Sequence, residues 1–153
     1  MTNSDWSSDV CSSDLDPALD TGAYLEYSSQ IQAACPWYPP TDASSFHYDD
    51  PEQAAAAAES LLMGFNVMRN IKEAEDNSPV SKVTKDAPPF LIIHGTDDHT
   101  VPFEQSEILY EKLTKNGCDV KFIELEGADH ADMQFFQDEL WNRIIEFFDE
   151  KLK

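Results

Sequence analysis

The chain has 153 residues, 41% of them hydrophobic, which suits one globular domain or part of one. With 30 acidic residues against 10 basic ones, the net charge is −20, and long-range repulsion excludes nucleic acids and anionic membrane surfaces as expected partners. The three cysteines, Cys11, Cys35 and Cys118, are far apart and form no CxxC pair, which argues against a disulfide scaffold or a zinc site.

A short repeat stands near the start of the chain. Residues 4–15, SDWSSDVCSSDL, carry one five-residue phrase twice, and a period of five builds an apolar face on neither a helix nor a strand. The string VCSSDL resembles the translation of a short-read sequencing adapter, so we interpret the repeat as a feature of the DNA. A disordered Ser/Asp-rich tail is the alternative. Residues 1–15 are therefore excluded from the fold prediction.

The next segments predict a strand followed by helices. Residues 31–37, IQAACPW, form a short apolar run that ends in a proline-rich turn, which indicates a buried strand. Residues 50–76 are rich in helix formers and open with Pro51, which predicts one or two helices. Four large apolar residues follow at helical spacing and predict a packed helix: Leu61, Leu62, Phe65 and Met68.

A strand, a helix and a second strand are predicted over residues 89–125. The continuous apolar run at 89–94 is typical of a strand covered on both faces. After Pro102 the sequence predicts a helix of about a dozen residues that stops at Asn116 and Gly117. The alternating, β-rich residues 119–125 predict the next strand.

A terminal amphipathic helix completes the predicted pattern. Between Asp132 and Leu152, large apolar residues recur three or four positions apart: Met133, Phe136, Leu140, Ile144 and Phe147. Strands that alternate with helices over short connections indicate an α/β fold with a parallel sheet.

Candidate functional residues follow the last two predicted strands. The loops 94–102 and 126–132 each leave a strand, and in parallel sheets function collects beyond these strand ends. The first loop offers an acid and the second a histidine. An acid that orients a histidine, which serves as general base for a nucleophile, is the logic of the Ser-His-Asp triad.

These motifs resemble α/β-hydrolases of the prolyl oligopeptidase type, especially small esterases such as feruloyl and acetyl-xylan esterases. The resemblance rests on WYPPTD at 37–42, on the stretch 78–102 and on EGADH at 126–130. It implies that Asp98, in a His-Gly-x-x-Asp-x-x-Val-Pro pattern, is the triad acid and that His130, in Gly-x-x-His, is the base.

The resemblance also implies a fold and a reaction. Residues 16–153 are then a partial α/β-hydrolase domain in which 43–77 forms a lid-like helical insertion. The implied reaction is hydrolysis of a small-molecule ester or a peptide, with no metal or organic cofactor.

Simpler readings of the same residues remain open. Asp97 or Asp98 can cap the helix that follows, and Asp97 is the main competitor for the triad acid. His130 can be a surface histidine, His94 closes a buried strand and is expected to be structural, and His99 is expected to be solvated. A metal site is the remaining alternative, although no recognised ligand spacing connects its candidates, Asp97, Asp98, His99, Asp129, His130 and Asp132.

Two parts of the family pattern are missing from the sequence. Neither the nucleophile elbow Gly-x-Ser-x-Gly nor a His-Gly-Gly oxyanion loop occurs in these residues, and Pro39 stands where the family has glycine. We therefore expect a C-terminal fragment of a serine hydrolase that has the acid and the base and is inactive by itself. The alternative is an intact acidic binding or scaffold domain without catalysis.

Overall fold

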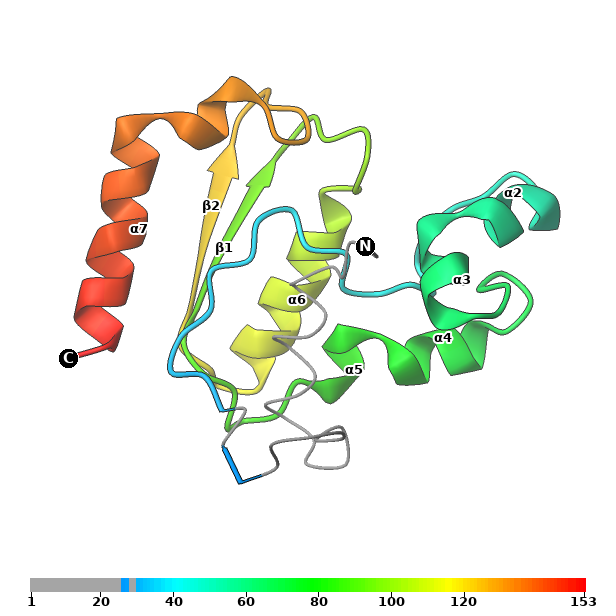
Figure 1. Cartoon of the computed structure of the whole chain (residues 1–153), viewed down its shortest axis with the longest axis horizontal. Coiled ribbons are helices and arrows are strands. Elements are labelled where there is room, and N and C mark those ends of the chain that lie inside the picture. The colour runs from blue at the N-terminus through cyan, green and yellow to red at the C-terminus, as the bar shows by residue number, and fades with distance from the viewer. Residues whose placement is uncertain (1–25, 28–29) are drawn as a thin grey trace.

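A parallel pair of strands forms the centre of the computed structural model, which describes residues 26–27 and 30–153 and leaves the repeat at 4–15 outside the described residues. Strand β1 (Phe90–Gly95) pairs with β2 (Val120–Leu125) in register along its whole length. Helix α6 (Glu104–Lys115) connects them, and α7 (Asp138–Lys151) follows β2 (Figure 1). The predicted strands 89–94 and 119–125 and the helix between them are confirmed.

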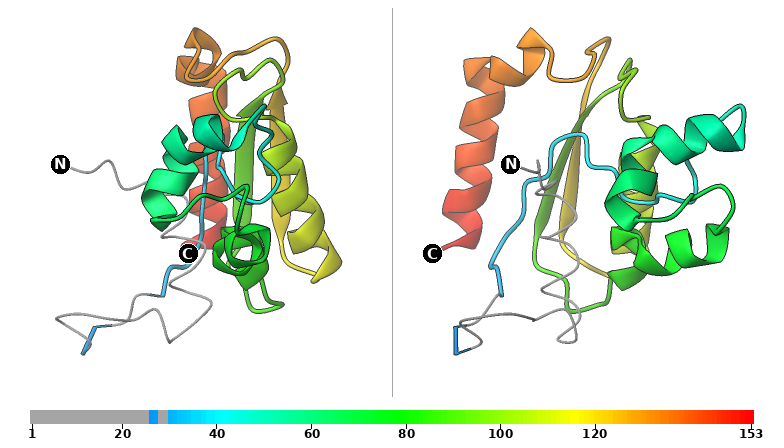
Figure 2. Two further views of the ribbon diagram at one scale, coloured as in Figure 1. Left: turned by 90° about the vertical axis from the view of Figure 1, so that its right-hand side faces the viewer. Right: turned by 45° about the vertical axis from the view of Figure 1, so that its right-hand side comes forward.

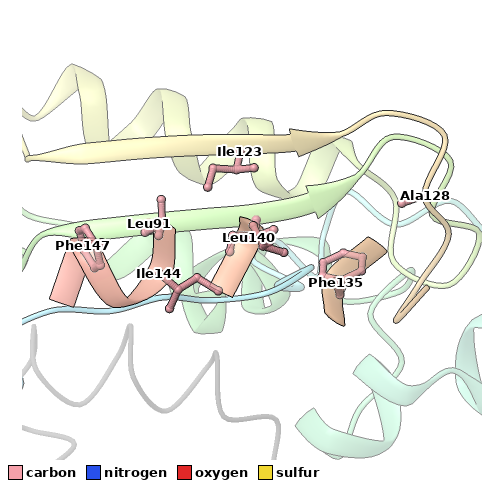
Figure 3. Packing of buried hydrophobic residues seen from close by; sticks show 8 residues of the cluster. Leu91, Ile123, Ala128, Phe135, Leu140, Ile144 and Phe147 are labelled. Carbon is pink, nitrogen blue, oxygen red and sulfur yellow. The ribbon is translucent and has the colours of Figure 1, made fainter. Parts of the chain in front are cut away.

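The two helices cover opposite faces of this strand pair because successive strand residues point to opposite sides. Leu91 and Ile93 pack with Ile144 and Phe147 of α7, as Figure 3 shows for the residues it labels. Phe90 and Ile92 pack instead with residues of α6, Leu109 and Leu113. Each fully buried side chain of this kind contributes about 1.5–3 kcal/mol by leaving water. β1 is thus an interior strand, and Figure 2 shows the three layers from two further directions.

The predicted strand at 31–37 is only partly right. The segment 34–38 runs parallel to β1, but it makes two isolated bridges, Ala34↔Phe90 and Trp37↔Ile93. Backbone bonds from Leu91 N to Ala34 O and from Tyr38 N to Ile93 O, at 2.9 and 2.8 Å, follow the usual parallel pattern. Between these two bonds the pattern needs an N–H donor at position 36. Pro36 has no N–H, so the ladder is interrupted there.

Along the chain, four short helices follow the 34–38 segment and precede β1. In Figure 1 they lie beside α6. Asp50 caps the first of them, and its side chain accepts bonds from Glu52 N and Gln53 N, both shorter than 3 Å. The helices are α2 (Pro51–Ala56), α3 (Ala58–Met63), α4 (Ile71–Asn77) and α5 (Pro79–Lys82).

The predicted packing of this helical segment is wrong. Leu61 and Leu62 are 71% and 66% exposed, and Met68 is 41% exposed. Helix α3 ends at Gly64, which has a left-handed φ of 77°, so the helical spacing never reaches Phe65 and Met68. The small core of the segment is built instead on Ala43, Val67 and Ala74, with Phe65 packed at its side.

The C-terminal region also differs from the prediction of one helix that begins at Asp132. A 3₁₀ helix, η2 (Met133–Phe136), precedes α7, and the Asp132 side chain caps it by accepting from Met133 N. A 3₁₀ helix has three residues per turn, so the apolar spacing changes here. Phe135 is therefore buried, whereas Met133 and Phe136 are 69% and 54% exposed.

No helix among the described residues combines the length and the apolar character that a bilayer span requires.

Candidate active site

Two loops meet at the carboxyl end of the strand pair. Asp97 N donates to Ala128 O over 3.1 Å, and Gly127 N donates to the Thr96 hydroxyl over 2.8 Å. Gly95 is required at this junction, since a Cβ on it would lie 2.2 Å from Ala128 O. The strand register and these bonds together hold the residues that follow each strand side by side.

Asp98 and His130 are brought into direct contact by this arrangement. His130 Nδ1 lies 2.8 Å from Asp98 Oδ2, although 32 residues separate them in sequence. The Asp98 side chain has no exposed surface, while 27% of the His130 side chain is exposed. Because the carboxylate can only accept, Nδ1 carries the proton of neutral His130 and Nε2 keeps its lone pair.

The second carboxylate oxygen of Asp98 is fixed by the backbone. Oδ1 accepts from Thr100 N and Val101 N, both at 2.8 Å, so the loop folds around the side chain. Asp97, the alternative acid, is exposed, and its side chain accepts a 3.3 Å bond from the Thr96 hydroxyl. Of the two acids, the structure therefore places Asp98 against the histidine.

His94 is fully buried beneath this pair. Its Nδ1 lies 2.7 Å from Ser106 Oγ, and its Nε2 lies 3.0 Å from Val101 O and 3.3 Å from Asp98 Oδ2. Burial lowers the pKa of His94 below its ordinary value, although Val101 O and the Asp98 charge oppose that shift. Burial thus favours the neutral form of this imidazole.

His99 and Asp129 form a separate exposed pair. His99 Nδ1 lies 3.3 Å from Asp129 Oδ2, with 79% and 55% of the side chains exposed. Bonds from the backbone N–H groups of His99 and then His130 lower the pKa of Asp129. No three His, Cys, Asp or Glu side chains converge as metal ligands within the described residues, so the six metal candidates do not form a cluster.

Two residues that sequence reasoning did not select also contact the site. The ring of Tyr38 packs on the ring of His130 with centroids 4.0 Å apart. Its φ of 39° is unusual for a residue other than glycine, and such strain is found at functional sites. Burial raises the pKa of Tyr38, and the negative charge of Asp98 adds to that rise.

Ser106 is the other residue, a buried hydroxyl on α6 that shares a face with Leu109 and Leu113. A serine in an apolar helix face indicates a buried hydrogen bond, but the sequence does not show which group is its partner.

Comparison with known proteins places this chain in a family. A family model described as BD-FAE matches residues 11–113, more than half of the chain. The chain belongs to the BD-FAE family. Asp98 lies inside the matched range and His130 lies beyond it.

Several similar proteins are named esterases. Esterase LipQ of Mycobacterium tuberculosis is 33% identical over 120 residues, which cover 76% of this chain and 27% of LipQ. Esterase LipC of the same organism is 37% identical over 74 residues, or 48% of this chain and 18% of LipC.

Solved structures agree with this family. A truncated carbohydrate esterase from gut microbiota has a TM-score of 0.75 at 28% identity, covering 85% of this chain and 46% of that structure. Esterase Est2 from Thermogutta terrifontis has a TM-score of 0.61 at 26% identity, covering 92% and 48%. The predicted α/β-hydrolase fold is confirmed for the part of that fold which this chain contains. The chain spans just under half of these structures and about a quarter or less of the two esterases from Mycobacterium tuberculosis.

Proposed function

We propose that this chain carries the acid and the base of a carboxylic ester hydrolase that works through a Ser-His-Asp triad. The observation that carries the proposal is the 2.8 Å contact from His130 Nδ1 to a fully buried oxygen of Asp98. A contact of this kind fixes the tautomer of the base and stabilises the imidazolium that forms during acyl transfer.

The roles of the two residues follow from their chemistry. His130 Nε2 takes the proton of a serine hydroxyl as that oxygen attacks the ester carbonyl, and later returns it to the leaving alcohol. Asp98 keeps its charge and orients the ring. The serine lies outside these 153 residues, because they contain no Gly-x-Ser-x-Gly elbow. The chain is then part of a longer enzyme, with residues 43–77 as its lid.

The substrate class is an ester. The similar proteins LipQ, LipC and the gut-microbial carbohydrate esterase are all named esterases, which favours esters over peptides. This leaves the prolyl oligopeptidase type as a likeness in motif, with no peptide bond cleavage proposed. No metal or organic cofactor takes part in the proposed reaction.

The test begins with the genomic DNA upstream of these residues. We expect an in-frame Gly-x-Ser-x-Gly elbow there, and hydrolysis of p-nitrophenyl acetate by the longer protein. His130→Ala and Asp98→Asn should each lower kcat by about 10⁴-fold or more, and His130→Ala, at a partly exposed ring, should change the melting temperature little.

Asp97→Asn is the matched control, since Asp97 is adjacent, acidic and exposed. It should cost far less than Asp98→Asn. An upstream sequence without a nucleophile elbow, or a larger loss in Asp97→Asn than in Asp98→Asn, would contradict the proposal.

A further inference from the structure

His94 has a hydrogen-bonding pattern that fixes its tautomer. Val101 O, 3.0 Å from Nε2, is a carbonyl oxygen and can only accept, so Nε2 must carry the proton. Nδ1 then accepts from the Ser106 hydroxyl, 2.7 Å away. Because His94 and Ser106 are both fully buried, no water competes for these positions.

The protonated Nε2 of His94 also faces the carboxylate of Asp98. It lies 3.3 Å from Oδ2, the same oxygen that contacts His130 Nδ1 at 2.8 Å. Oδ1 already accepts two backbone N–H groups, so four N–H groups face a carboxylate with no exposed surface, and the one on His94 is shared with Val101 O. A buried carboxylate depends on such donors, because burial otherwise disfavours its charged form.

The groups that face the Asp98 carboxylate come from different parts of the fold. The backbone groups of Thr100 and Val101 hold one oxygen and belong to the same loop as Asp98. His94 is the partner that comes from the rigid strand β1, and Ser106 anchors it to helix α6. His94 therefore adds a constraint on the rotation of the Asp98 carboxylate that comes from outside its own loop.

We propose that His94 and Ser106 are positioning residues for the base. Val101 O keeps the proton of His94 on Nε2 and Ser106 anchors the ring to α6, so that His94 faces Asp98 Oδ2, and Asp98 in turn holds His130 with its proton on Nδ1. The proposal rests on the proposed function, in which Asp98 and His130 are the triad acid and base.

The experiment follows the tautomer of each histidine in the chain labelled with ¹⁵N-histidine. Long-range ¹H–¹⁵N spectra distinguish a protonated from an unprotonated ring nitrogen for His47, His94, His99 and His130. At neutral pH we expect the Nε2–H form for His94 and the Nδ1–H form for His130.

Three variants test the relay. His94→Phe keeps a ring but has no donor, and we expect His130 to lose its dominant Nδ1–H form. His94→Gln places an amide N–H near the position of Nε2, and we expect it to restore that form at least in part. Ser106→Ala is the mildest change: Val101 O still favours the Nε2–H form of His94, but the ring loses its anchor to α6, and we expect a smaller loss of the Nδ1–H form in His130.

Ser78→Ala is the matched control. Ser78 is also a fully buried serine, and its hydroxyl donates to Ala74 O and accepts from Ala43 N. Its loss should lower stability in the same way as Ser106→Ala but leave the His130 spectrum unchanged. If His94→Phe does not fold, the His130 spectra of Ser106→Ala and Ser78→Ala are compared, and that comparison tests the proposal.

Each outcome bears on one proposal. A His130 without the Nδ1–H form in the unmodified chain would contradict the Asp98–His130 pair and therefore the proposed function. An Nδ1–H form that survives in Ser106→Ala and in folded His94→Phe as it does in Ser78→Ala would overturn only the role of His94 and Ser106.

Discussion

Asp97 and Asp98 are chemically identical neighbours with opposite surroundings. After Gly95 the chain turns, which leaves Asp97 in solvent and directs Asp98 inward to His130 and His94. The exposed acid needs no partner, whereas the buried one requires donors for its charge. The difference between the two residues is thus one of environment, and it gives them different expected roles.

His94 should make the stability of the fold depend on pH. Burial lowers its pKa in the folded state, so the unfolded chain binds more protons as the pH falls through the ordinary histidine value of about 6.5. The contribution of His94 is then fully present above that pH and is lost as the pH decreases below it.

The measurement is urea unfolding of the chain and of His94→Gln between about pH 5 and 8, the range in which histidine titrates. The free energy of unfolding of the unmodified chain, relative to His94→Gln, should fall with decreasing pH. The comparison cancels the titration of the many carboxylates that do not contact His94. A difference that stays flat would show that His94 is protonated as easily in the fold as in the unfolded chain.

Gln105 connects α6 to the turn at residues 41–45. Its side-chain oxygen accepts from Thr41 N and Asp42 N at 2.9 and 2.8 Å, and its nitrogen donates to Ser45 Oγ at 2.6 Å. The residue is 1% exposed, so these bonds lie in the interior. The turn that follows Tyr38 is therefore fixed to the helix that also carries Ser106.

Gln105→Leu should destabilise the fold by about 2–4 kcal/mol, since each buried polar group left unpaired costs about 1–3 kcal/mol. Gln53→Leu is the control. Gln53 accepts a similar 2.8 Å bond from Asp49 N, but at the surface, so its loss should cost less than about 0.5 kcal/mol. Equal midpoints of urea unfolding for the two variants would show that the Gln105 bonds contribute little.

The whole molecule carries a net charge of −20, which opposes its own compact state. Its surface ion pairs, such as Lys121–Glu150 at 3.3 Å, are exposed and contribute little in return. Self-repulsion therefore outweighs attraction among the surface charges.

The melting temperature should consequently rise between about 0.01 and 0.5 M NaCl, because added salt shortens the range of the repulsion. Glu146→Gln with Asp149→Asn removes two exposed acids near the end of α7, where the helix dipole also disfavours negative charge. This double variant should show a higher melting temperature at low salt and a smaller salt response. A melting temperature that falls with salt would mean that ion pairs dominate.

We expect no ester hydrolysis by this chain above background. Loss of the triad serine costs roughly 10⁶-fold in kcat in a comparable enzyme, and an absent oxyanion donor costs about 10²–10³-fold. Hydrolysis of p-nitrophenyl acetate should match that of buffer, and a fluorophosphonate probe should not label the protein. Labelling at a stoichiometry near one would contradict this expectation.

The sequence by itself determined the central elements of the fold. Strands β1 and β2 and helix α6 were predictable because their apolar patterns, proline starts and glycine stop act locally. The alternation of these elements also indicates a parallel sheet, which places the loops of Asp98 and His130 at one edge. The two residues themselves were chosen from motif and resemblance, and their catalytic role stays a proposal.

Only the tertiary structure decided which groups touch. Leu61 and Leu62 are exposed despite their helical spacing, because Gly64 ends α3 and because no neighbour among the described residues covers that face. Pro36 interrupts a strand whose composition is otherwise suitable, since the ladder to β1 needs an N–H at the position that proline occupies. The contacts of His130 with Asp98 and Tyr38 and of His94 with Ser106 join residues from separate elements. Such contacts depend on strand register and helix packing, which no local pattern encodes.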